Sequence, residues 1–112
     1  MKRCRITVLK RHFDEELAKN TAQGNRQVSD AQGRAKFYAD YAKPDGFCDE
    51  AWKAIYQYVF ALAHGSGQFY YGDWIEKPGV AICSCNDGLR PVIFKVERTD
   101  EEATINYTPN HD

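Results

Sequence analysis

The stretch CDEAWKAIYQYVFALAH, residues 48–64, decides the fold. Its apolar positions recur at spacings of four, three, four and three, which places them on one face of an α-helix. These positions are Cys48, Trp52, Ile55, Val59 and Leu62. Asp49 and Glu50 stand in the first turn, where the helix dipole favours acids, and Gly65 fits a left-handed cap just past the end. A helix with one continuous apolar stripe must cover a sheet or another subunit.

The flanking sequence predicts the sheet that this helix covers. Four segments have the alternation or β-rich composition of strands: residues 3–9, 34–40, 80–85 and 92–98. FDEELAKN predicts one or two helical turns, the polar stretch 21–33 predicts a loop with a mobile or binding role, and ATINY predicts an edge strand. The order is β-α-β-α-β-β, which indicates an α+β fold with one main helix packed on a mostly antiparallel sheet.

Length and charge narrow the class of protein. At 112 residues we expect a single domain, 1–112, with a polar tail from about 108. The 15 basic and 16 acidic residues argue against nucleic acid as the main partner, because phosphate binding needs a basic excess. The early apolar run, ITVL, is too short for a signal peptide or a membrane span, so we expect a cytoplasmic protein that contacts no membrane. In that compartment its four cysteines more often stay reduced, bind metal or do redox work than form structural disulfides.

Cys83 and Cys85 are the first candidates for chemistry. They lie two residues apart in a predicted strand, so their side chains emerge on the same face. Their α-carbons are then about 6–7 Å apart, which suits a shared iron or zinc ion, or exchange with a partner thiol, better than a stable disulfide. A single spaced pair is a weak metal signature, because zinc and cluster sites use two such pairs. Packing as small hydrophobes is an equal alternative for this pair.

Cys4 and Cys48 could complete a set of four. Cys48 opens the main helix, whose N-terminus favours a thiolate, while Asp49 and Glu50 oppose this with negative charge. Cys4 continues the apolar face of its strand and Cys48 continues the helical stripe. For both we favour packing over chemistry, because free cysteine is among the most buried residue types.

Arg90, in the turn NDGLRP at 86–91, is the candidate electrostatic support. A fixed guanidinium beside two thiols could stabilise thiolates, or it could clamp a carboxylate or phosphate ligand. Its structural alternative is an ion pair with Asp87, with Asp73 or with the start of the main helix. Asp87 and Gly88 themselves are typical of hairpin turns.

Three motifs carry a resemblance to a known family. GFCDEAW at 46–52, GVAICSC at 79–85 and NDGLRPVIFKVER at 86–98 resemble a family of small uncharacterised proteins found mainly in anaerobic bacteria and archaea. Its motifs are G-F-C-x-x-A-W and C-x-D-G-x-R-P-V, and the likeness covers most of residues 2–98. The resemblance implies a fold and an anaerobic habitat, but no assigned activity. The family's early loop carries a Cys-Pro pair and its late cysteines are adjacent, whereas here the early loop lacks cysteine and Ser84 separates the late pair.

An aromatic loop offers a rival interpretation. The segment SGQFYYGDWIEKPG contains Phe69, Tyr70, Tyr71 and Trp74, which could close a pocket or form a surface for a second copy or another protein partner. Packing of this loop over the helix is its structural alternative.

The remaining residues support no familiar catalytic site. The histidines have no metal-binding spacing, His64 suits the carbonyl end of the helix, and no serine elbow or phosphate-binding glycine loop is present. This favours a protein that is not an enzyme. Our leading hypothesis is a cysteine-centred metal-binding or thiol-redox protein. The rival hypothesis is a non-catalytic binding or oligomerising module in which the cysteines are only packed.

Overall fold

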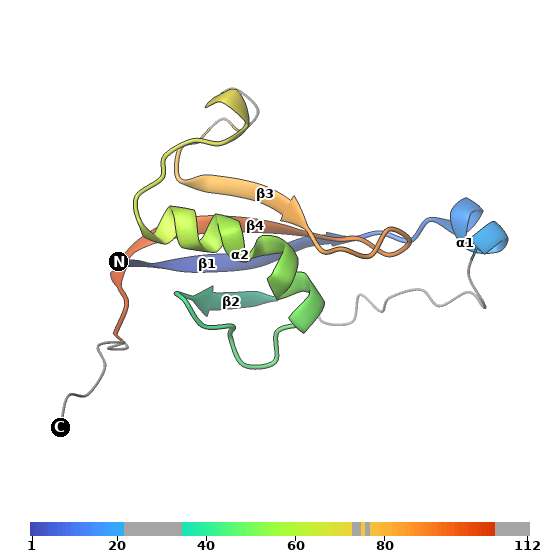
Figure 1. Ribbon diagram of the computed structural model, residues 1–112, viewed down its shortest axis with the longest axis horizontal. Helices are drawn as coiled ribbons and strands as arrows, with labels where there is room; N and C mark the ends of the chain where they lie inside the picture. Colours follow the sequence, from blue (N-terminus) through green and yellow to red (C-terminus); the bar gives the residue numbers. More distant parts are fainter. Residues whose placement is uncertain (22–34, 73–74, 76, 105–112) are drawn as a thin grey trace.

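The fold is a four-stranded antiparallel sheet with one long helix across one face (Figure 1). A computed structural model describes residues 1–21, 35–72, 75 and 77–104. Its elements are β1 (Lys2–Arg11), α1 (Glu15–Thr21), β2 (Lys36–Ala39), α2 (Asp49–Ala63), the 3-10 turn η1 (Tyr70–Gly72), β3 (Val80–Ser84) and β4 (Val92–Glu102). The predicted α+β class and the order β-α-β-α-β-β are confirmed, with η1 added between α2 and β3.

The strand order is β2-β1-β4-β3, so β1 and β4 form the centre of the sheet. Ile6 stands opposite Val96 and Val8 opposite Phe94, which aligns the apolar sides of the two central strands. The register between β1 and β4 shifts between Val8 and Lys10. An irregularity of this kind changes which residues face the core, because side chains alternate along a strand. Arg11, opposite Val92, is thereby brought to the side of the sheet that α2 covers.

α2 packs through the predicted stripe. Its buried residues are Ala51, Ile55, Val59, Leu62 and Ala63, while Trp52 is half-buried. Cys48 is the N-cap and His64 the C-cap, so the predicted limits are confirmed within one residue. Gly65 has a φ of 98°, the left-handed conformation that its position predicted.

Arg98 links the C-terminal end of α2 to the sheet through hydrogen bonds. Its Nη1 donates to the carbonyl oxygens of Leu62, at 3.1 Å, and Ser66, at 2.8 Å. These bonds occupy carbonyl groups that a helix end leaves without intrahelical partners. Arg98 therefore joins β4 to the last turn of α2.

An aromatic cluster closes the core near the N-terminal end of α2. Phe47 packs edge-on against Phe37, with ring centroids 5.0 Å apart, and lies 5.4 Å from the ring of Phe94. It thus joins β2, β4 and the segment leading into α2 around one ring. Phe47 is buried and belongs to the same core as Ile6, Ile55 and Val96.

Three predicted boundaries need correction. α1 includes Thr21, which we had placed in the loop, and the rest of that loop lies outside the described residues. β4 continues to Glu102 rather than ending at Arg98, because it pairs along the whole of β1. Of the predicted edge strand at 103–107, only Ala103 and Thr104 are described, and neither is in a strand. The polar tail from about 108 also lies outside the described part.

Candidate functional site

A cavity of about 670 Å³ opens beside the start of α2. Its apolar lining comes from Val8, Phe37, Phe47, Ala51, Val92 and Phe94. Its polar lining comes chiefly from Arg11, Cys48, Glu50, Cys85, Asp87 and Arg90. The volume is within the range of about 300–1,000 Å³ that is typical of small-molecule sites. Two of the four candidate cysteines and the candidate arginine therefore share one cavity.

The β3–β4 connection places Cys85 in this cavity. The backbone N–H of Cys85 donates to the carbonyl of Val92 at 3.1 Å, which continues the strand pairing one residue beyond β3. In return, the N–H of Val92 donates to the Cys85 sulfur at 3.3 Å. The next residue, Asn86, donates from its side-chain amide to the carbonyl oxygen of Glu50 at 3.5 Å. This last contact joins the connection to the first turn of α2, beside Cys48.

Arg90 is oriented by Asp87. The Asp87 Oδ1 accepts the backbone N–H groups of Leu89, at 2.8 Å, and Arg90, at 2.9 Å. Its Oδ2 accepts Nε of the Arg90 side chain at 3.0 Å. The backbone N–H groups of Arg90 and Leu89, together with the guanidinium, hold the pKa of Asp87 below its usual value. The ion pair expected as the structural alternative is thus present, and it also fixes the guanidinium at the cavity.

Cys83 shares a face with Cys85 but does not line the cavity. It stands opposite Phe94, and both cysteines pack against the core, as the spacing predicted. Burial raises the pKa of the Cys83 thiol to about 12, because a thiolate there would lose its hydration. Cys83 is therefore protonated at neutral pH and is a poor nucleophile or metal ligand.

Cys4 is a core residue, as we favoured. It is 0% exposed, and its thiol donates to the carbonyl oxygen of Val59 at 3.7 Å. Burial raises its pKa to about 11, with a small opposing effect of the positive charge of Arg98. Val59 lies eleven residues beyond Cys48, which corresponds to roughly 16 Å along a helix. Cys4 therefore belongs to the opposite end of α2 from the cavity.

The packing expected for Cys48 is wrong. Its side chain is exposed and lines the cavity, instead of continuing the apolar stripe into the core. The reason is that Cys48 is the N-cap, with an extended backbone at φ −65° and ψ 130°, so helical periodicity does not yet apply to it. Its side chain makes no capping hydrogen bond to the first turn of α2.

The four cysteines do not gather into one metal site. Within residues 1–21, 35–72, 75 and 77–104, no three side chains from His, Cys, Asp and Glu gather closely enough to hold a metal ion. The cysteines instead divide into a pair that lines the cavity, Cys48 and Cys85, and two that do not, the buried Cys4 and the half-buried Cys83. All four are free thiols.

The aromatic loop has mixed exposure. Phe69 is half-buried, with its ring edge-on to that of Tyr58 at 5.4 Å, so the packing interpretation fits this residue. Tyr71 is 98% exposed and adopts a φ of 62°, which is uncommon for a residue other than glycine. The Tyr70 side chain and the whole of Trp74 lie outside what the structure describes.

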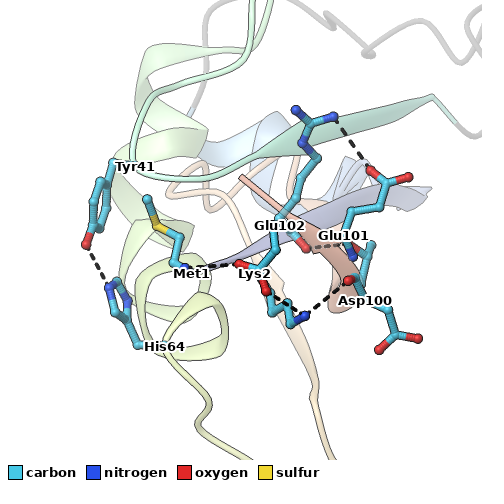
Figure 2. Close-up of polar contacts among 9 residues, drawn as sticks. Met1, Lys2, Tyr41, His64, Asp100, Glu101 and Glu102 are labelled. Atoms are coloured by element: carbon cyan, nitrogen blue, oxygen red, sulfur yellow. Dashed lines mark hydrogen bonds and ion pairs between the residues drawn. The ribbon is translucent and has the colours of Figure 1, made fainter. Parts of the chain in front are cut away.

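A second polar cluster surrounds His64, and Figure 2 shows the Tyr41 hydroxyl directed at its imidazole ring. The oxygen lies 2.7 Å from Nε2, while Nδ1 lies 2.8 Å from the carbonyl oxygen of Phe60. Since a carbonyl can only accept, Nδ1 donates; in a neutral imidazole Nε2 then accepts a hydrogen bond from the Tyr41 hydroxyl. The ring also stacks on Tyr41 and packs against Phe60. These contacts fit the structural role at the helix end that we predicted for His64.

Sequence reasoning missed part of the cavity lining. Phe47, inside the GFCDEAW motif, and Arg11, just beyond the predicted first strand, both line the cavity, and neither was named as a site residue from the sequence. The flanking Gly46, with a φ of 77°, marks a turn that delivers Phe47 to the core. Nothing in the local alternation of β1 indicates Arg11, because the register shift after Val8 depends on β4.

Fold and cavity together define a small α+β protein with a thiol-lined pocket. No helix in the part of the chain that is described has the length and apolar character needed to span a bilayer. The sequence matches no family model, no curated protein and no solved structure. The resemblance to the family from anaerobes therefore stays a prediction.

Proposed function

We propose that this protein acts through thiol–disulfide exchange at Cys48 and Cys85. The observation that carries the proposal is the cavity of about 670 Å³ that these two free thiols share with Arg90. Cys4 and Cys83 do not line this cavity, and desolvation raises the pKa of both thiols, which disfavours their reactive thiolate form. The reducing cytoplasm predicted from the sequence suits a protein with four free thiols.

The proposed reaction is a two-step exchange with a small disulfide R–S–S–R′. The exposed Cys48 thiolate attacks one sulfur, which forms a mixed disulfide with R–S and releases R′–S⁻. The Cys85 thiolate then attacks the Cys48 sulfur, which releases R–S⁻ and closes a Cys48–Cys85 disulfide. Overall, two protein thiols are oxidised, one small disulfide is reduced and two protons are released. The N–H of Val92 and the guanidinium of Arg90 stabilise negative charge on sulfur during these steps.

The test compares the reactivity of the four thiols. The folded protein is treated with iodoacetamide without oxygen, and the modified cysteines are located by mass spectrometry. We expect Cys48 and Cys85 to be alkylated much faster than Cys4 and Cys83. Cys83→Ser is the matched control for Cys85→Ser, because the two residues share a strand face two positions apart. Treatment with glutathione disulfide should then give a wild-type mass lower by two hydrogens, because the Cys48–Cys85 disulfide closes. Cys85→Ser should instead retain one glutathione as a mixed disulfide with Cys48.

Two results would contradict this proposal. Equal alkylation of all four thiols would show that the cavity pair has no special reactivity. Reactivity that appears only after a chelator is added would show that the thiols hold a metal, as the alternative hypothesis from the sequence supposed.

A second candidate function is self-association through the aromatic loop. It is favoured by Tyr71, whose ring is 98% exposed on a left-handed backbone. Such a conformation costs about 1–2 kcal/mol in an ordinary residue and is better tolerated by asparagine. Tyr71→Asn should therefore stabilise the isolated chain while weakening a dimer. Sedimentation velocity over a concentration series measures the dimer, and a wild type that stays monomeric throughout would contradict this second function.

A further inference from the structure

We propose that the cavity binds a small molecule with an apolar body and a single carboxylate, held by Arg90 beside the two thiols. This inference rests on the proposed function for the identity of the site, and it adds the chemical class of the substrate. The thiol chemistry alone does not select among small disulfides, so the selection must come from the lining of the cavity.

The apolar part of the lining selects the body of the ligand. Phe37, Phe47 and Phe94 contribute three aromatic rings to one side of a pocket whose remaining apolar lining is aliphatic. The Phe37 and Phe47 rings are already packed edge-on, and Phe47 is fixed by its contact with Phe94. A preformed apolar surface of this kind favours a flat hydrophobic or aromatic group, which it binds without first having to order itself.

Arg90 selects the charged part of the ligand. Its Nε is occupied by Asp87, and Asp87 is fixed in turn by two backbone N–H groups. Over the described part of the chain, the two terminal nitrogens of Arg90 make no hydrogen bond. They form one edge of a planar guanidinium, which presents two parallel N–H donors to a carboxylate.

The charge of the cavity favours one negative charge on the ligand rather than two. Both acids in the lining are compensated, Asp87 by Arg90 and Glu50 by Lys53 at 2.8 Å. A carboxylate can therefore approach Arg90 with limited repulsion. Arg11 also lines the cavity, but a phosphate monoester carries up to two charges at neutral pH and meets more repulsion from the two acids than a carboxylate does.

The test uses equilibrium binding of matched probes that contain no disulfide. 2-Naphthoate and 2-naphthamide have the same shape and differ in charge, and both are titrated into the wild type and Arg90→Gln by NMR. We expect 2-naphthoate to bind the wild type at least about tenfold more tightly than 2-naphthamide, as one charge-assisted bidentate contact provides. Arg90→Gln should remove this preference while keeping the weaker binding of the amide. Cys83→Ser, which lies outside the cavity lining, should bind both probes as the wild type does.

Arg90→Lys is the control for loss of the turn in Arg90→Gln. It keeps a positive charge that can pair with Asp87, but it lacks the two parallel N–H donors of the guanidinium. It should reduce the preference for 2-naphthoate while the protein stays folded. Equal affinity for the two probes, no binding of either, or a preference that survives in Arg90→Gln would overturn the inference. Tighter binding of 1-naphthyl phosphate than of 2-naphthoate would overturn the assignment to a carboxylate. Since none of these probes reacts with thiols, and iodoacetamide carries no charge, the thiol proposal and the ligand proposal fail separately.

Discussion

At the scale of the residue, Asp87 combines a turn with an ion pair. One carboxylate oxygen accepts two backbone N–H groups of the turn, and the other holds Arg90 at the cavity. The Asp-Gly sequence correctly indicated a turn, and the ion pair was among the alternatives that we weighed for Arg90. What the turn chemistry did not indicate is that the same carboxylate orients a cavity arginine.

The pH dependence of stability in Asp87→Asn tests what the ionised Asp87 carboxylate contributes. The folded-state pKa of Asp87 is lowered, so its contribution to stability is present above the unfolded pKa of about 3.9 and is lost as the pH falls through the folded value. Because the pair is partly exposed, we expect Asp87→Asn to cost less than about 1 kcal/mol at neutral pH. Urea midpoints at neutral and acidic pH should differ less in the variant than in the wild type. Asp45→Asn, in an exposed turn, is the control, and an equal loss on acidification in wild type and Asp87→Asn would contradict the prediction.

Cys4 and Cys83 should resist ionisation. The pKa is about 11 for Cys4 and about 12 for Cys83, both above the ordinary value of 9.0. A raised folded-state pKa means that each thiol contributes stability below pH 9.0, and this contribution is lost as the pH rises through the folded value. We expect the thiolate absorbance of the folded protein at about pH 10 to be nearly unchanged by Cys4→Ala/Cys83→Ala, given these pKa values. In denaturant the same double variant should lose about half of that absorbance, because all four thiols then titrate alike. If the double variant lost as much thiolate absorbance in the folded state as in denaturant, Cys4 and Cys83 would ionise like accessible thiols, which would contradict the prediction.

At the scale of the element, the limits of α2 follow from local sequence, whereas its packing depends on distant strands. Its stripe, its acidic first turn and Gly65 are all encoded within residues 48–65, so its limits could be predicted. Its side-chain contacts could not, since Val59 meets Cys4 of β1, which lies 55 residues away in sequence. The exposure of Cys48 also escaped prediction, because the helical stripe was extended by one residue into the N-cap.

Ile55→Ala tests the packing of α2 on the sheet. Ile55 is 0% exposed, so truncation removes buried methyl groups and leaves a cavity, at a cost of about 2–5 kcal/mol. Gln57→Ala, on the exposed face of the same helix, should change stability by less than about 0.5 kcal/mol. Chemical denaturation followed by circular dichroism measures both variants. Similar free energies of unfolding for the two variants would show that α2 does not pack as described.

At the scale of the whole molecule, the elements differ in how many neighbours support them. β1 and β4 are each paired on both edges, β2 and β3 on one edge, and α2 covers one face (Figure 1). α1 lies beyond the end of the sheet, outside the two layers. Local opening follows this arrangement, because an element with fewer buried contacts opens at a lower free energy.

Amide hydrogen exchange should be slower in elements that have more neighbours. We expect the slowest exchange in the paired centre of β1 and β4, around Ile6 and Val96, and the fastest in α1. The N–H groups that donate within the β1–β4 pairing serve as the internal reference. Exchange in α1 as slow as in β1 would place α1 in the cooperative core and contradict the arrangement.

The sequence by itself determined the kinds of element, their order and the limits of α2, because alternation, helical periodicity and capping act over a few neighbouring residues. It also indicated that Cys83 and Cys85 share a face. Only the tertiary structure decided the strand order, the turning of Arg11 towards the cavity by the register shift, and which two of the four thiols line the cavity. These properties depend on contacts between residues that are distant in the chain. A cavity lined by Val8, Phe47 and Val92 exists only once β1, the entry to α2 and β4 are packed together.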